Sequence, residues 1–226
     1  MIPKHIVIIP DGNRRWAKIN EINKVLSYNL SGGYNQIKNL CTTAKELGVK
    51  YFSLWAFSTE NWKRTPKEIK EILDAVNKGL DSFIEDAHVN KYRFRHLGKK
   101  DRLPSEIKDK LNELEKRTSE YQNFNVILGL DYGGRDELIR AVNRILKNGM
   151  TEINEEIFKS YLDTKSTPDP DLIIRTGGEK RLSGFMPFQS AYSELYFTDI
   201  LFPDFKQEDL KEAILEYNKR ERRFGG

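Results

Sequence analysis

Short apolar runs alternate with longer amphipathic segments along this chain of 226 residues. Six of the runs are apolar enough to form buried strands: residues 6–9, 51–56, 92–97, 126–130, 172–174 and 195–197. Segments between them place apolar residues at helical spacing. This alternation predicts an α/β fold in a single domain over residues 1–226, with a mainly parallel central sheet flanked by helices.

The longest amphipathic segment, residues 66–87, has a wide apolar face. Its apolar positions repeat at helical spacing: Ile69, Ile72, Leu73, Val76, Leu80, Phe83 and Ile84. Taken alone, this face is explained best by packing against the core of the domain. A second helix is expected over residues 36–47, where Cys41 lies on the apolar side as a small core residue.

The first apolar run ends in a loop that suits a phosphate ester. Asp11, Gly12 and Asn13 are residue types that turn a strand into a helix. The free N–H groups at the start of such a helix attract an anion, and Arg14 and Arg15 add charged donors. Asp11 would repel that anion unless a divalent cation lay between them. The pattern therefore indicates a metal-bridged diphosphate, although an ordinary strand-to-helix turn uses the same residue types.

Three further segments, residues 51–64, 169–185 and 192–205, also combine an apolar strand with groups that bind phosphate or metal. In a parallel sheet, ligands bind beyond the carboxyl ends of the strands, where these loops are expected to meet. Two arginines and a hydroxyl can hold a diphosphate without a metal. The candidate residues are Ser58, Thr59, Glu60, Asn61, Trp62, Arg64, Arg175, Arg181, Ser183 and Glu194.

Composition excludes several other classes of protein. Hydrophobic residues make up 38% and charged residues 32%, no apolar run approaches the roughly 18 residues of a membrane span, and the N-terminus lacks a signal pattern, so we expect a cytoplasmic protein. His5, His88 and His96 show no metal-ligand spacing, and no glycine-rich nucleotide loop occurs. A net charge of +4 does not demand a nucleic acid, and we expect none as a partner; a filter-binding assay would test this.

Four motifs, DGNRRW, FSTENWKR, IRTGGEKRLSGF and SELYFTD, occur in this order. Together they resemble the cis-prenyltransferases, the undecaprenyl diphosphate synthase family, over essentially the whole chain. The aspartate-rich DDxxD clusters of trans-prenyltransferases are absent, which favours the cis family. The resemblance implies a transferase that adds isopentenyl diphosphate to an allylic diphosphate such as farnesyl or geranylgeranyl diphosphate. The product would be a polyprenyl diphosphate for lipid-carrier synthesis.

The resemblance also implies roles for individual residues. Asp11 and Mg²⁺ would activate the allylic diphosphate, with Glu194 as a second metal-linked carboxylate. Asn61 would orient the diphosphate oxygen or water that accepts the proton, because an amide is itself a weak base. The residues that match isopentenyl diphosphate binders are Arg175, Arg181 and Ser183. The wider substrate-binding set adds Gly12, Asn13, Arg14, Arg15, Trp16, Lys24, Tyr28, Ser58, Thr59, Glu60, Trp62, Arg64, Arg223 and Gly225.

In this family the helices that match residues 36–47 and 66–87 line an apolar tunnel for the growing prenyl chain. Burial of each CH₂ group there would contribute about 0.8 kcal/mol. The C-terminal run RRFGG resembles the R-x-G ending through which one subunit reaches the active site of its partner. It implies a homodimer in which Arg223 and Gly225 act across the interface, although a charged tail has the same composition. Release of the product suggests a peripheral membrane contact.

Two regions depart from the family pattern. Lys24 and Tyr28 stand nearest to the usual Arg and His after the DGN loop, and Asp131 stands where Asn is common. Pro10 and Tyr28 resemble archaeal members. The main rival hypothesis is a non-catalytic subunit of a heteromeric synthase. Such subunits tend to lack the aspartate and parts of the motif loops, which this chain retains.

Overall fold

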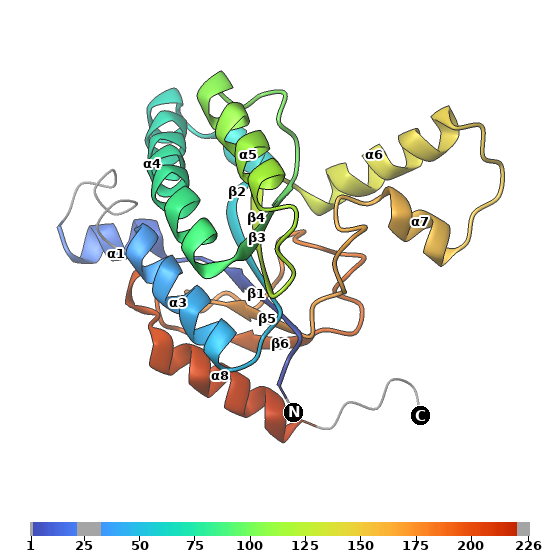
Figure 1. Ribbon diagram of the computed structural model, residues 1–226. Helices are drawn as coiled ribbons and strands as arrows, with labels where there is room; N and C mark the ends of the chain where they lie inside the picture. The colour runs from blue at the N-terminus through green and yellow to red at the C-terminus, as the bar shows by residue number, and fades with distance from the viewer. Residues whose placement is uncertain (1, 22–32, 221–226) are drawn as a thin grey trace.

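A computed structural model describes residues 2–21 and 33–220 (Figure 1). Six parallel strands form one sheet in the order β3-β4-β2-β1-β5-β6. The strands are β1 (His5–Ile9), β2 (Tyr51–Ser58), β3 (Tyr92–Leu97), β4 (Phe124–Tyr132), β5 (Leu172–Arg175) and β6 (Glu194–Phe197). The predicted α/β class and the parallel sheet are therefore confirmed.

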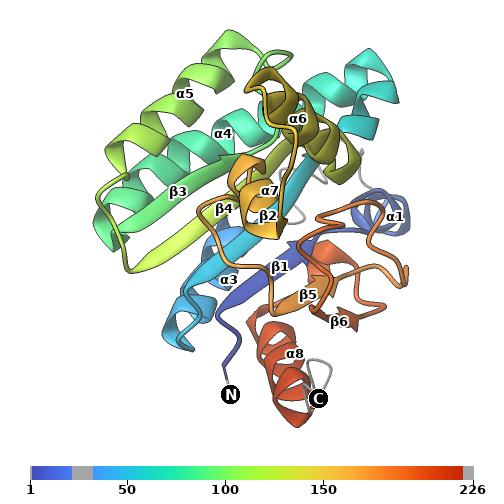
Figure 2. The ribbon, with the colours of Figure 1, turned by 90° about the vertical axis from the view of Figure 1, so that its right-hand side faces the viewer.

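Helices cover both faces of the sheet (Figure 2). One face carries α3 (Tyr34–Glu46) and α4 (Pro66–Asn90), and α6 (Gly134–Lys147) and α7 (Glu155–Tyr161) lie over the other. The remaining helices are α1 (Asn13–Ile19), α5 (Ser105–Arg117) and α8 (Gln207–Lys219), with short 3₁₀ turns η1 (Thr59–Lys63) and η2 (Phe202–Asp204). No helix in the described ranges is both long enough and apolar enough to cross a membrane.

Alternating side chains of β1 show why the central strands are apolar throughout. Ile6 and Ile8 point into a core packed under α3, α4, α5 and α8, whereas Val7 and Ile9 point into a smaller core on the opposite face. Successive side chains of a strand face opposite sides, so a strand covered on both sides needs apolar residues at every position. Cys41 is buried in the larger core, as predicted.

The order of the strands places a ligand crevice at the end of β1. The chain pairs β2 with one edge of β1 and returns much later to pair β5 with the other edge. Connections leave in opposite directions at such a switch point, which opens a crevice beyond the carboxyl ends of the strands. Asp11 follows β1 and Arg175 ends β5, so the first and third motifs meet in this crevice.

Candidate active site

Hydrogen bonds to the Asp11 backbone and a glycine turn fix the loop after β1. The hydroxyl of Thr176 accepts a hydrogen bond from the Asp11 N–H at 2.9 Å and donates to the Asp11 carbonyl at 2.8 Å. The N–H of Phe202 donates to the same carbonyl at 2.9 Å. Gly12 has a φ of +106°, and a Cβ there would lie 2.8 Å from the side chain of Leu201. Glycine is therefore required for the loop to turn.

The side chain of Asp11 pairs directly with Arg175. Its Oδ2 accepts a hydrogen bond from Arg175 Nη2 at 2.9 Å, and its Oδ1 lies 3.5 Å from Arg15 Nη2. The Asp11 side chain is 33% exposed, whereas that of Arg175 is only 6% exposed. Sequence reasoning assigned these two residues to different diphosphates. The structure instead brings them together as one ion pair at the mouth of the sheet.

Arg175 is also tied to the third motif. Its Nη1 donates to Ser183 Oγ at 2.7 Å and to the backbone carbonyl of Arg181 at 2.5 Å. Its Nε is buried and has no hydrogen-bond partner among the described residues. The Arg181 side chain turns away: it is 61% exposed and pairs with Glu179. Arg175 and Ser183 therefore share a site, and the Arg181 guanidinium lies outside it.

Ser58 and Asn61 form the two halves of a capping box at the start of η1. Asn61 N–H donates to the Ser58 hydroxyl at 3.2 Å, and Ser58 N–H donates to the Asn61 amide oxygen at 3.0 Å. This reciprocal pair stabilises the turn. With its oxygen bound by Ser58 N–H, the Asn61 amide has its NH₂ group as a donor for the site. The side chain can hold an oxygen in place, but an amide is too weak a base to take the proton.

A carboxylate that the sequence analysis missed joins the first two motifs. Glu68, in the first turn of α4, accepts a hydrogen bond from Arg64 Nη1 at 3.1 Å and lies 3.7 Å from Arg14 Nε. The Glu68 side chain is 15% exposed, so the two guanidiniums converge on a mostly covered charge. Its place in the first turn of α4, four residues after Arg64, was the available signal, although Arg64 itself precedes the helix.

The indole of Trp62 points away from the site. Its Nε1 donates to Asp131 Oδ1 at 2.9 Å, and Arg102 Nε donates to Asp131 Oδ2 at 3.0 Å. The Arg102 guanidinium also lies over the Trp62 ring, 5.1 Å from its centre. Asp131 is fully buried and has a φ of +51°. The unexpected aspartate is thus the anchor that ties η1 to the end of β4.

Two other predicted substrate residues have structural partners instead. Trp16 Nε1 donates to Asp204 at 2.8 Å. Thr59 packs so closely on Gly133 that a Cβ at that glycine would lie 2.2 Å from its hydroxyl. Like Trp62 and Arg181, these residues do not contribute to the wall of the cavity described next.

A cavity of about 1360 Å³ opens at the end of β1 and extends across the sheet beneath α3 and α4. Its wall includes Arg175 at the end of β5 and residues of β1, β2, β4 and β3, so the cavity runs toward the edge strand β3. Its polar end is formed by Asp11, Gly12, Asn13, Arg14, Arg15, Ser58, Glu60, Asn61, Arg64, Arg175 and Ser183. Its apolar part includes Phe52, Leu54, Val76, Leu80, Phe83, Phe94, Val126 and Leu128. The expected tunnel helices do line it.

Glu194 does not join Asp11 within one chain. It begins β6 and pairs in register with Leu172 at the start of β5, whereas the site lies beyond the end of β5. Three residues of strand, or about 10 Å, separate those levels. The Glu194 carboxylate accepts a hydrogen bond from Arg220 at 2.8 Å. The expectation of an Asp11–Glu194 metal pair in one chain is wrong, because Glu194 lies at the opposite edge of the sheet.

Four expected substrate residues, Lys24, Tyr28, Arg223 and Gly225, lie outside the described residues.

Besides Glu68, sequence reasoning missed two residues that shape the site. Thr176 closes the loop around Asp11, and its position directly after Arg175 was the only sequence signal. Gln36, near the start of α3, donates to the carbonyls of Phe202 and Phe205 and ties α3 to η2. No motif marked that glutamine.

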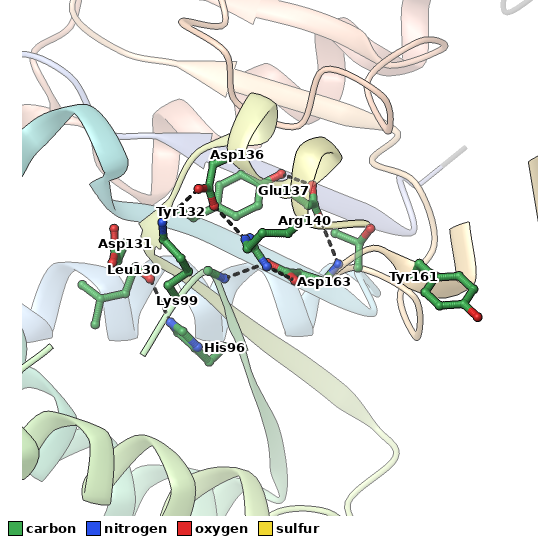
Figure 3. Close-up of polar contacts among 12 residues, drawn as sticks. His96, Lys99, Leu130, Asp131, Tyr132, Asp136, Glu137, Arg140, Tyr161 and Asp163 are labelled. Atoms are coloured by element: carbon green, nitrogen blue, oxygen red, sulfur yellow. Dashed lines mark hydrogen bonds and ion pairs between the residues drawn. The ribbon is translucent and has the colours of Figure 1, made fainter. Parts of the chain in front are cut away.

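A second polar cluster surrounds the start of α6 (Figure 3). Tyr132 donates to Glu137 at 2.6 Å, and Arg140 pairs with Asp163 through two hydrogen bonds at 2.7 and 2.6 Å. Burial raises the pKa of Glu137, against the opposing effect of the bond from Tyr132. None of these residues lines the cavity. The cluster fastens α6 to the sheet and has no part in the site.

Comparisons with known proteins agree with this geometry. Residues 9–225 match the prenyltransferase family model described as undecaprenyl diphosphate synthase. The chain belongs to the cis-prenyltransferase family. An isoprenyl transferase of Treponema denticola is 43% identical over 222 residues, covering 98% of this chain and 97% of that protein. Membership of this family gives the class of activity of the chain, which is isoprenyl transfer by a polyprenyl diphosphate synthase.

An archaeal member and a plant member of the family are also similar to the chain. A tritrans,polycis-undecaprenyl-diphosphate synthase (geranylgeranyl-diphosphate specific) of Pyrococcus abyssi is 40% identical, covering 100% of this chain and 88% of that protein. The crystal structure of lavandulyl diphosphate synthase from Lavandula x intermedia in complex with dimethylallyl diphosphate has a TM-score of 0.94 at 32% identity, covering 100% and 99% of the two chains. Bacterial and archaeal members match about equally well, so these comparisons do not place the chain in the archaeal branch.

Proposed function

We propose that this cis-prenyltransferase condenses isopentenyl diphosphate with an allylic diphosphate, farnesyl or geranylgeranyl diphosphate, in a magnesium-dependent reaction that yields a polyprenyl diphosphate for lipid-carrier synthesis. The observation that carries the proposal is one cavity with the Asp11–Arg175 pair at its polar end and an apolar wall along the rest. Its volume exceeds the roughly 300–1,000 Å³ of sites for drug-sized ligands. A diphosphate head with a long hydrocarbon tail fits this division.

The donor set at the polar end fits Mg²⁺ only together with substrate. Among the described residues, no three carboxylate, histidine or cysteine side chains lie close enough to hold a metal. Mg²⁺ usually takes one or two carboxylates and completes its shell with water and substrate phosphates, which suits the partly exposed Asp11. Bound there, Mg²⁺ would neutralise the charge that develops on the departing diphosphate.

In the reaction, the C–O bond of the allylic diphosphate breaks and the terminal alkene carbon of isopentenyl diphosphate forms the new C–C bond. The positive charge that this leaves on the methyl-bearing carbon is removed when the neighbouring CH₂ group, on the diphosphate side, loses a proton and the new alkene forms. Arg14, Arg15 and Arg175 stabilise phosphate charge through guanidinium donors. Asn61 donates to an oxygen and orients it, so the proton leaves to a phosphate oxygen or to water.

Product analysis tests this proposal directly. The purified protein is incubated with labelled isopentenyl diphosphate, Mg²⁺ and one of three primers, dimethylallyl, farnesyl or geranylgeranyl diphosphate, and the products are measured by mass spectrometry. We expect elongated polyprenyl diphosphates from farnesyl or geranylgeranyl diphosphate, and none when Mg²⁺ is chelated. An Asp11→Asn variant is the inactive control, and Asp74→Asn, which changes an exposed carboxylate on α4, is the matched active control. Absence of any elongation by wild-type protein would overturn the proposal.

We also propose that the enzyme is a homodimer. The support is an exposed apolar stripe on α6, where Ile139, Val142 and Leu146 are 63%, 43% and 63% exposed and recur along one side of the helix. A two-fold interface buries the same stripe on both subunits. Leu146→Glu should therefore halve the molar mass measured by light scattering, whereas Leu215→Glu, at an exposed leucine on α8, should not. A wild-type monomer would contradict the dimer.

The dimer proposal includes a role for Arg223 at the partner's diphosphate site, and mixed dimers test it. An Arg223→Ala chain combined with an Asp11→Ala chain should recover part of the activity that each lacks alone, because one of the two sites would then be intact. No recovery in verified mixed dimers would contradict a role across the interface.

For localisation, we propose a cytoplasmic enzyme with a peripheral membrane contact for product release. A vesicle co-sedimentation assay with and without substrates would test this contact.

A further inference from the structure

Helices α3 and α4 are joined by three side chains beside the cavity. The Tyr34 hydroxyl of α3 donates to Asp86 Oδ2 of α4, and Lys38 Nζ donates to Asp86 Oδ1 at 2.8 Å. Tyr34 and Lys38 are four residues apart, so one face of α3 presents both donors to a single carboxylate. We call Tyr34, Lys38 and Asp86 the Asp86 clamp.

The clamp lies next to Phe83, the last residue of α4 that lines the cavity. Phe83, one turn before Asp86 on α4, has its ring centre 5.6 Å from that of Phe94 on β3 and 6.5 Å from that of Tyr34, which meets it edge-on. All three aromatic residues line the cavity. β3 is the edge strand farthest along the cavity from β1. The clamp therefore fixes the end of the cavity remote from Asp11.

Charge makes this junction hard to separate. The Asp86 side chain is 18% exposed. Burial favours a higher pKa for Asp86, but the hydrogen bonds from Lys38 and Tyr34 outweigh it and lower the pKa. Burial, together with the bond to Asp86, raises the pKa of Tyr34. A neutral phenol and an ammonium thus donate to an ionised carboxylate, and a hydrocarbon chain that pushed between the helices could not replace those bonds.

We propose that the Asp86 clamp is a specificity determinant that limits the length of the prenyl product by holding Phe83 as the end wall of the cavity. This inference rests on the proposed function. While the tail is shorter than the cavity, each added unit gains burial against apolar walls. When the tail reaches Phe83, further growth requires the ring to move and the helices to part. Elongation stops when the free energy needed to open the clamp exceeds the free energy gained by burying the next five-carbon unit.

Removal of the Tyr34 hydroxyl tests the clamp with little change in shape. Tyr34→Phe keeps the ring beside Phe83 but removes one of the two bonds to Asp86, so the product distribution should shift to longer chains by about one five-carbon unit or more, since the end wall can yield. Lys38→Met removes the other bond from a residue that is 44% exposed and should shift the distribution in the same direction. Products are measured by mass spectrometry at equal total incorporation of isopentenyl diphosphate.

A matched tyrosine provides the control. Tyr121 donates or accepts a 2.8 Å hydrogen bond with His88 on α4, and neither residue lines the main cavity. Tyr121→Phe should leave product length unchanged, and melting temperatures of all variants verify the fold. If the wild type makes polyprenyl products but both clamp variants make products of unchanged or shorter length, the proposed role of the clamp is overturned and the proposed function stands. A wild type that makes no prenyl product would overturn the proposed function and the clamp with it.

Discussion

Replacement of Asp11 with asparagine removes one negative charge from the polar end of the cavity while keeping the shape of the side chain. In the wild-type protein, the Asp11 carboxylate lies 2.9 Å from Arg175 Nη2 and 3.5 Å from Arg15 Nη2. An amide cannot neutralise either guanidinium, and it is a poor ligand for Mg²⁺. If this charge organises the departing diphosphate, kcat should fall at least about 100-fold, which is roughly 3 kcal/mol in activation free energy.

The same change should cost much less in stability. Removal of one partner from a fully buried ion pair costs about 3–5 kcal/mol. Asp11 is 33% exposed, so water screens the charge that remains on Arg175, and we expect a loss below about 2 kcal/mol. Urea denaturation measures this loss, and Asp74→Asn on the surface of α4 controls for loss of an exposed carboxylate. A large kinetic effect with a small stability effect would separate chemistry from folding.

A double-mutant cycle refines the prediction. Arg175→Met alone should raise the KM for isopentenyl diphosphate, because a buried guanidinium donor is lost. Since the two side chains touch, their effects on kcat/KM should be coupled by about 0.5–3 kcal/mol. Additivity within about 0.5 kcal/mol would mean that Asp11 and Arg175 serve separate diphosphates. A near wild-type kcat for Asp11→Asn at saturating Mg²⁺ would refute the role of Asp11 itself.

Three other changes test separate parts of the molecule. Val76→Phe should shorten the product, seen by mass spectrometry, because Val76 lines the apolar wall; unchanged length would contradict that. Asp131→Asn should lower the free energy of unfolding by about 1–2 kcal/mol in urea titrations, since the partly exposed Arg102 loses its charge partner. It should also lower kcat about 5- to 30-fold, because η1 loses its anchor. Burial lowers the pKa of His5 to about 4, below its ordinary value of 6.5. Between pH 6.5 and pH 4, His5 therefore binds a proton only in the unfolded chain. The free energy of unfolding should therefore fall as pH drops from 6.5 to 4, by up to about 1.4 kcal/mol per unit from His5. His5→Gln should remove this part in urea titrations and leave the part due to His96, whose pKa burial also lowers.

Strand ends were the most predictable part of the site. Asp11 and Arg175 each follow an unbroken apolar run, and in a parallel sheet the ends of such runs meet at one edge. Glu194 shows the limit of that reasoning. It also stands beside an apolar run, but it begins the strand, and a carboxylate at the start of a parallel strand lies at the edge opposite the ligand.

Side-chain direction within the loops could not be predicted from the sequence. Ser58 and Asn61 are three residues apart and bind each other's backbone N–H groups, a short-range pattern that was open to recognition. The direction of Trp62 depends on Asp131, which is 69 residues away and holds a backbone conformation with positive φ. Such a contact depends on how β2 and β4 pair, and no local pattern encodes it.

The two ends of the cavity are built from different kinds of element. Strand ends and their loops form the end that holds Asp11 and Arg175, whereas the two helices held by Asp86, packed on Phe94 of β3, form the other. Substitutions at the helix junction can accumulate without disturbing the hydrogen bonds around Arg175. Within one lineage, selection can therefore retune the size of the molecule that is made while the groups that carry out the chemistry stay the same.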